Sequence, residues 1–73
     1  MNIKEMHDKV VEIIGEGETR YTEISIYSDK IEIITDKGIT VSKLCALDKY
    51  FEQESYIKAR NEGLLYIRYN IGE

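Results

Sequence analysis

The sequence predicts a small α+β domain in which two helices pack on one face of an antiparallel sheet. Apolar residues recur every three or four positions near the N-terminus, which indicates a helix, whereas they alternate in the segment that follows, which indicates strands. Loops that contain glycine separate segments whose apolar residues pair in register. Seventy-three residues suffice for one domain, so we expect a single domain over residues 1–73 with the element order α-β-β-β-α-β-β.

The first helix is predicted over residues 3–14. Asn2 can accept a hydrogen bond from the first turn as the N-cap, and Glu5, three residues later, completes a capping-box pattern. Gly15 and Gly17 both tolerate the left-handed conformation that ends helices, so the helix is expected to stop there. Its apolar stripe consists of Ile3, Met6, Val10, Ile13 and Ile14.

A three-stranded meander is predicted in the segment between the two helices. A two-residue turn at Asp29-Lys30 would set Ile26 opposite Ile33, and a three-residue loop at Asp36-Lys37-Gly38 would set Ile33 opposite Val41. In this register all three strands keep their apolar side chains on one face, and a slip of one residue would destroy that agreement. The remaining pairs are Ile24 with Thr35 and Thr35 with Ile39.

A second helix is predicted after Ser42, whose hydroxyl can cap it. Its buried stripe consists of Leu44, Leu47 and Phe51. Cys45 lies beside this stripe and is expected to be a small core residue.

Two structures are possible for the chain that follows this stripe. The helix runs on to Asn61 with Gly63 as its cap, or it stops near Gln53 and residues 56–60 form a strand. Pairing favours the strand, because a three-residue loop that ends at Gly63 sorts apolar and polar side chains onto opposite faces of a hairpin. The predicted pairs are Ile57 with Ile67 and Ala59 with Leu65 on one face, and Tyr56 with Arg68 and Lys58 with Tyr66 on the other.

Few residues of the chain suit catalysis or metal binding. One histidine, His7, and one cysteine cannot build a zinc site without carboxylates. Asp8 follows His7 directly on a helix, where adjacent residues face different directions, so no His–Asp pair is predicted. The glycines form no phosphate-binding pattern. We therefore expect a protein that is not an enzyme and holds no cofactor or metal.

Charge and hydropathy predict a cytoplasmic protein. No apolar run is long enough to span a membrane, and no segment has the pattern of a signal peptide. The net charge is −4, but it is unevenly distributed. Residues 1–54 carry twelve acids and seven bases, whereas residues 55–73 carry three bases and two acids.

The outer face of the predicted C-terminal hairpin is the candidate partner-binding site. It gathers Tyr56, Lys58, Arg60, Tyr66 and Arg68. Tyrosine and arginine are frequent hot-spot residues in protein interfaces, and rings beside cations also suit nucleic acids. The same residues fit ordinary cross-strand packing on a solvated face. Because the acidic chain repels phosphate, a protein partner is favoured over a nucleic acid.

In size and composition the chain resembles small accessory proteins of phages and mobile elements, among them anti-CRISPR proteins. It has six tyrosines, abundant isoleucine and neither proline nor tryptophan. The resemblance implies a non-enzymatic inhibitor that occupies a surface of a host enzyme or defence nuclease. The alternatives are a nucleic-acid-binding module that uses the C-terminal hairpin and a structural homo-oligomer. A homodimer would also help so small a core.

Overall fold

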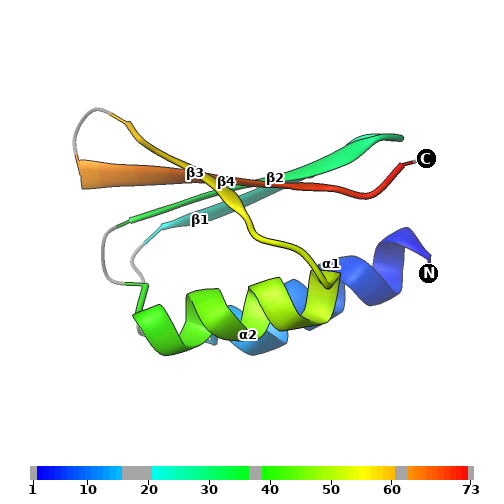
Figure 1. Cartoon of the computed structure of the whole chain (residues 1–73), viewed down its shortest axis with the longest axis horizontal. Coiled ribbons are helices and arrows are strands. Elements are labelled where there is room, and N and C mark those ends of the chain that lie inside the picture. The colour runs from blue at the N-terminus through cyan, green and yellow to red at the C-terminus, as the bar shows by residue number, and fades with distance from the viewer. Residues whose placement is uncertain (1, 16–20, 37–38, 61–62, 73) are drawn as a thin grey trace.

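The computed structural model describes residues 2–15, 21–36, 39–60 and 63–72. In this part of the chain two helices and four strands follow one another in the order α-β-β-α-β-β (Figure 1). They are α1 (Ile3–Ile14), β1 (Thr22–Ile26), β2 (Lys30–Asp36), α2 (Val41–Phe51), β3 (Tyr56–Ala59) and β4 (Leu64–Asn70). The α+β class is confirmed, but the described chain has one strand fewer than predicted.

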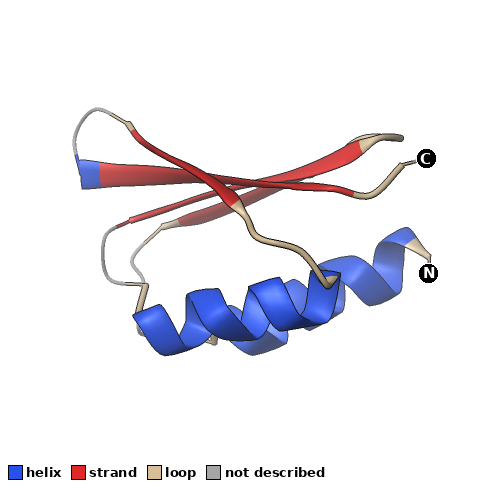
Figure 2. Ribbon diagram, viewed as in Figure 1, coloured by secondary structure: helices blue, strands red, loops and turns tan. Residues whose placement is uncertain are grey.

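The four strands form one antiparallel sheet in the order β1-β2-β4-β3. β2 and β4 have seven residues each, pair along their whole length and form the centre of the sheet. Both helices run along the same side of the sheet in Figure 2. We call this side the inner face and the opposite side the outer face. Neither of the two described helices is long and apolar enough to cross a membrane.

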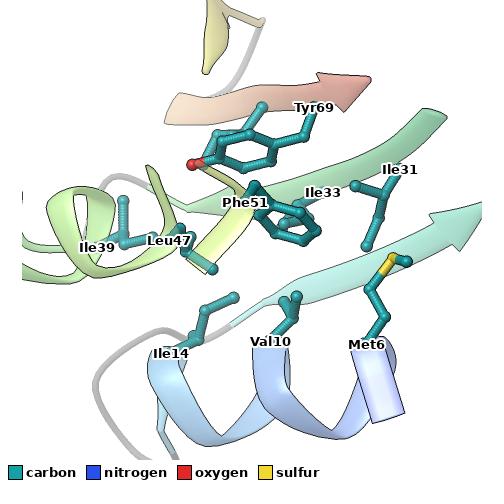
Figure 3. Close-up of a cluster of buried hydrophobic side chains, with 10 residues drawn as sticks. Met6, Val10, Ile14, Ile31, Ile33, Ile39, Leu47, Phe51 and Tyr69 are labelled. Carbon is teal, nitrogen blue, oxygen red and sulfur yellow. The ribbon is translucent and has the colours of Figure 1, made fainter. Parts of the chain in front are cut away.

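One cluster of buried side chains joins both helices to the inner face of the central strands (Figure 3). Val10 on α1, Leu47 on α2 and Ile67 on β4 have no exposed surface. The ring of Tyr69 stacks on that of Phe51, with 4.3 Å between the centroids. Burying an aliphatic side chain of this kind stabilises a fold by about 1.5–3 kcal/mol, so this cluster is the main source of stability.

α1 has the predicted bounds and the predicted cap. The side-chain oxygen of Asn2 accepts a hydrogen bond of 2.7 Å from the amide of Glu5. Gly15 ends the helix with a φ of 76°, a conformation that L side chains rarely adopt. The ammonium group of Lys43 on α2 donates to the carbonyl of Ile14, so a cation lies at the negative end of the helix dipole.

The first hairpin forms where it was predicted, but its register differs. The turn lies at Ser28-Asp29 instead of Asp29-Lys30, and a backbone hydrogen bond of 2.8 Å between the flanking residues closes it. Ile26 therefore pairs with Ile31, not with Ile33. A shift of two residues leaves every side chain on its predicted face, because side chains alternate along a strand with a period of two. The other corrected pairs are Ile24 with Ile33 and Thr22 with Thr35.

The third strand of the predicted meander, residues 39–41, does not form. The hydroxyl of Thr40 accepts a hydrogen bond of 3.2 Å from the amide three residues later, so Thr40 is the N-cap of α2. The helix begins at Val41, which is 76% exposed, and the predicted cap Ser42 lies inside it. The place beside β2 is taken by β4, since seven residue pairs bury more apolar surface than three. The predicted loop residues 37–38 lie outside the described residues.

The last hairpin has the predicted register, and all four predicted pairs are confirmed. α2 ends at Phe51, which excludes the longer helix. The side-chain amide of Gln53 both donates to and accepts from the backbone of Asn70, at 2.8 and 2.9 Å, and ties the connection to the end of β4. Gly63 has a φ of 77°, as its place in the loop requires, whereas residues 61–62 lie outside the described residues.

Two side chains are placed differently from the predictions. Cys45 is exposed, because the stripe of α2 turns toward the sheet and leaves this neighbouring position at the surface. His7 Nδ1 lies 3.5 Å from Asp8 Oδ1, so the predicted absence of a His–Asp contact is wrong. Both of these side chains are more than half exposed, and the contact forms at the solvent boundary of the helix.

Candidate functional site

Two rows of side chains cross the outer face, with one residue from each strand in each row. The first row consists of Glu23, Ile34, Tyr66 and Lys58, on β1, β2, β4 and β3. The second row consists of Ser25, Glu32, Arg68 and Tyr56, in the same strand order. None of the described helices or strands lies over these rows, as Figure 1 shows. The rows therefore form an uncovered surface four strands wide.

The predicted site residues lie together on this face. The guanidinium carbon of Arg68 lies 4.7 Å from the ring centroid of Tyr56, and that of Arg60 lies 5.9 Å from the ring centroid of Tyr66. The two rings meet edge to face with 6.3 Å between their centroids. Lys58 pairs with Tyr66 across the hairpin. These contacts hold the side chains in place and leave them at the surface, where Tyr56 is 48% exposed.

Glu32 lies at the centre of the face, between the predicted residues and β1. The hydroxyl of Tyr66 donates a hydrogen bond of 2.5 Å to Glu32 Oε2, and Lys30 Nζ lies 3.5 Å from the same oxygen. The hydrogen bond from Tyr66, with the charges of Lys30 and Arg68, holds the pKa of the Glu32 carboxyl below its usual value. Burial and the neighbouring carboxylate raise the pKa of Tyr66, so its hydroxyl keeps the proton that it donates.

Apart from Lys30, charges of opposite sign occupy opposite halves of the outer face. The acids lie on β1 and β2 and are Glu23, Glu32 and Asp36. The bases of the other half lie on β4, on β3 and directly after β3, and are Arg68, Lys58 and Arg60. Lys30, at the start of β2, is a fourth base. The face is thus nearly balanced in charge, although the whole chain carries −4.

The half of the site that β1 and β2 contribute was not predicted from the sequence. Glu32 and Ile34 become neighbours of Arg68 and Tyr66 because β2 pairs with β4, a contact that links residues far apart in the sequence. One signal was visible in the sequence, since Ile34 interrupts the polar positions of its strand. A single apolar residue at a surface is common, so Ile34 indicates an interface only together with Tyr66, its partner across β2 and β4.

Other surfaces of the described chain offer less chemistry. No group of three or more His, Cys, Asp or Glu residues in the described ranges is arranged to hold a metal ion. A hollow of about 190 Å³ between α1 and β1 is lined in part by His7, Val11 and Thr22, and Asp8 is not in its lining. A more open hollow between the two helices is lined in part by Ile13 and Tyr50. Lys9, Lys49 and Glu52 also line this second hollow, but it is shallow and open, so the outer face with its network of ring contacts and hydrogen bonds is the better candidate.

Comparison with known proteins assigns no family to the chain. No protein-family model matches it, and neither the curated proteins nor the solved structures give a match. The candidate site therefore depends on geometry and charge alone.

Proposed function

We propose that this chain is a non-enzymatic protein-binding module and that the outer face of its sheet is the interface. The observation that carries the proposal is the uncovered network of Tyr56, Arg60, Tyr66 and Arg68. Side chains already held in one arrangement lose little conformational entropy on binding, and tyrosine and arginine are the usual hot-spot residues of interfaces.

The distribution of polarity over the face supports a protein partner. Ile34 and Tyr66 lie side by side on the two central strands and are half-buried by their neighbours. Glu23 and Lys58 lie at the two edges and are exposed. An apolar and aromatic centre surrounded by charged residues is the usual composition of a protein interface.

Nucleic acid is the weaker candidate for the same face. Binding to phosphate depends on cations that no nearby carboxylate neutralises. Here Glu32 lies opposite Arg68 and 3.5 Å from Lys30, so a phosphate backbone laid across the sheet would meet a carboxylate at its centre. The hydroxyl of Tyr66 is also committed to Glu32.

If the chain is an inhibitor, its partner is a host enzyme or defence nuclease in the cytoplasm of an infected cell. This identity of the partner is inferred from the size and composition of the chain and stays a prediction. A module that acts by occupying a surface needs no catalytic group, so the inhibitor interpretation and the proposed binding mode are compatible.

The test reverses one charge on the outer face and one on the helix side. Arg68→Glu changes the centre of the face, and Lys9→Glu makes the same charge change on α1, where Lys9 forms an exposed contact with Glu12. Each immobilised variant is used to capture proteins from a lysate of the source cell, and the molar mass of each variant is measured in parallel. Circular dichroism checks that both variants fold.

The proposal predicts a protein partner, either another chain or a second copy of this one, that wild type and Lys9→Glu bind and Arg68→Glu does not. A partner that Arg68→Glu retains in full would contradict the use of this face. Binding to a random-sequence oligonucleotide at low salt, lost in Arg68→Glu and steeply weakened by added salt, would assign the face to nucleic acid instead. A chain that binds no protein and does not self-associate would also contradict the proposal.

A further inference from the structure

The outer face is complementary in charge to itself. We propose that it binds a second copy of this chain, face to face, about a twofold axis that runs parallel to the strands. This inference rests on the proposed function, because it names the occupant of the same face. The two copies would form a closed dimer with the helices of each copy on the outside.

The strand order gives this arrangement its register. A twofold axis that passes between β2 and β4 places β1 over β3 of the second copy and β2 over β4 of the second copy. Each row of the face then lies over the same row in reverse order. In the first row, Glu23 meets Lys58 of the partner subunit, and Ile34 meets Tyr66 of the partner subunit.

The second row is complementary in the same way. Glu32 meets Arg68 of the partner subunit near the axis, and Ser25 meets Tyr56 of the partner subunit at the edge. The acidic half of one face thus lies on the basic half of the other. Matched potentials of this kind fix the register of an interface and disfavour other arrangements.

A twofold axis perpendicular to the strands gives the opposite result. It places β1 over β1 and β3 over β3 of the second copy, so that Glu23 lies near the acidic half of the other face. Lys58 and Arg60 then lie near the same bases of the partner subunit. Like charges placed together across an interface cost free energy, so the parallel axis is favoured.

The size of the face indicates a reversible dimer. Four strands spaced about 4.8 Å apart give a face about 19 Å wide, and its longest strands, β2 and β4 with seven residues each, extend about 20 Å. This footprint is smaller than that of a standard interface, so we expect a dissociation constant on the order of micromolar. Aligned sheets cross at about 30°, so the pairs nearest the axis keep the closest register.

The test uses the pair at the edges of the face. Within one chain, three strand spacings, or about 14 Å, separate Glu23 from Lys58, so they form no pair. Glu23→Lys and Lys58→Glu each replace two attractive contacts of the dimer by two repulsive ones. Sedimentation of each variant should show a dimer dissociation constant raised on the order of tenfold to a hundredfold. Glu12→Lys, the same charge change on α1, should leave it unchanged.

Mixing the two variants gives the decisive result. In a mixed dimer the lysine introduced at position 23 of one copy faces the glutamate introduced at position 58 of the other, and the second edge contact pairs two unchanged residues. Both edge contacts are then attractive, so a one-to-one mixture should form dimers near the wild-type concentration. The double variant Glu23→Lys/Lys58→Glu should also dimerise. If Glu23→Lys does not fold, Glu23→Gln removes the attraction without a new charge and should weaken the dimer less.

A wild-type chain that stays monomeric at high concentration would overturn this inference. Variants that dimerise as well as wild type, or a mixture that stays monomeric, would overturn the proposed arrangement. Failure here is distinct from failure of the proposed function, since a monomer that still captures a different protein through Arg68 leaves the outer face as the interface.

Discussion

The inner and outer faces of the sheet are built from alternate residues of the same four strands, but different interactions organise them. On the inner face Ile33 and Ile67 have no exposed surface, and the helices pack directly against them. On the outer face the neighbouring residues Ile34 and Tyr66 stay partly exposed, and hydrogen bonds, ion pairs and ring contacts order the surface.

This difference separates stability from recognition. A face that excludes water contributes to stability through its apolar area, and each change there is felt by the whole fold. A face ordered by contacts at the solvent boundary contributes little to stability, because exposed ion pairs are worth about 0–1 kcal/mol. Substitutions on the outer face should therefore change binding and leave the fold intact.

The largest expected difference in stability is between two isoleucine-to-alanine substitutions, one on each face of the sheet. Ile67→Ala, at a fully buried position of the inner face, should lower the free energy of unfolding by about 4 kcal/mol. Ile34→Ala, on the half-buried outer face, should lower it by about 1 kcal/mol. Urea unfolding at low protein concentration measures both values. Equal losses would mean that the outer face is part of the core.

A second comparison removes one tyrosine hydroxyl from each face. The hydroxyl of Tyr69, a side chain that is 1% exposed, donates a hydrogen bond of 2.5 Å to Asp48 Oδ1. Tyr69→Phe should cost about 2 kcal/mol, because the hydroxyl belongs to a buried side chain and its acceptor is a carboxylate. Tyr66→Phe, which loses the bond to Glu32 at the surface, should cost less than about 1 kcal/mol. The reverse order in thermal unfolding would contradict the assignment of the two faces.

Removal of one buried polar group from the inner face should raise the free energy of unfolding, whereas the substitutions above lower it. Thr35 is fully buried, and within the described part of the chain its hydroxyl has no hydrogen-bond partner. Thr35→Val keeps the shape and removes this group, so it should raise the free energy of unfolding by about 1 kcal/mol. A clear loss of stability would show that the hydroxyl does have a partner in the folded chain.

The smallest expected effect is the pH dependence of stability that Glu32 gives to the outer face. The pKa of Glu32 lies below its ordinary value of 4.5, chiefly because Tyr66 donates to the ionised carboxylate. This contribution to stability is complete above pH 4.5 and is lost as the pH falls through the lower pKa of the folded state. In Tyr66→Phe the carboxyl of Glu32, followed by NMR, should titrate at higher pH than in wild type. An unchanged titration would contradict the hydrogen bond.

The parts of the fold that sequence reasoning predicted correctly depend on neighbours in the chain. The cap at Asn2 and the glycine at position 15 mark the two ends of α1, and each acts on residues next to it in the chain. The last hairpin was predicted from the pairing of residues on the two sides of one short loop. Residues 39–41 show where this reasoning fails, because they alternate as a strand would. The pairing of β4 with β2 takes the place of that strand, and the hydroxyl of Thr40 caps α2 instead.

The central pairing of β2 with β4 was not predictable from local spacing, and it defines the candidate site. Five residues of the hairpin were predicted to form the site, and they do lie on one face. Glu32 and Ile34 enter that face from β2, more than thirty positions away from Arg68 in the chain. The outer face can therefore be recognised as self-complementary only when the strand order is known.

The most direct test of the self-complementary face is a zero-length crosslink between subunits. A carbodiimide joins a carboxylate to an amine only when the two are in contact, and Glu23 and Lys58 of one chain are three strands apart. We expect a Glu23–Lys58 crosslinked peptide in wild type, with mixed isotopes when ¹⁴N- and ¹⁵N-labelled chains are combined. Its absence at concentrations where the chain is dimeric, or a crosslink only through the helices, would contradict the proposed interface.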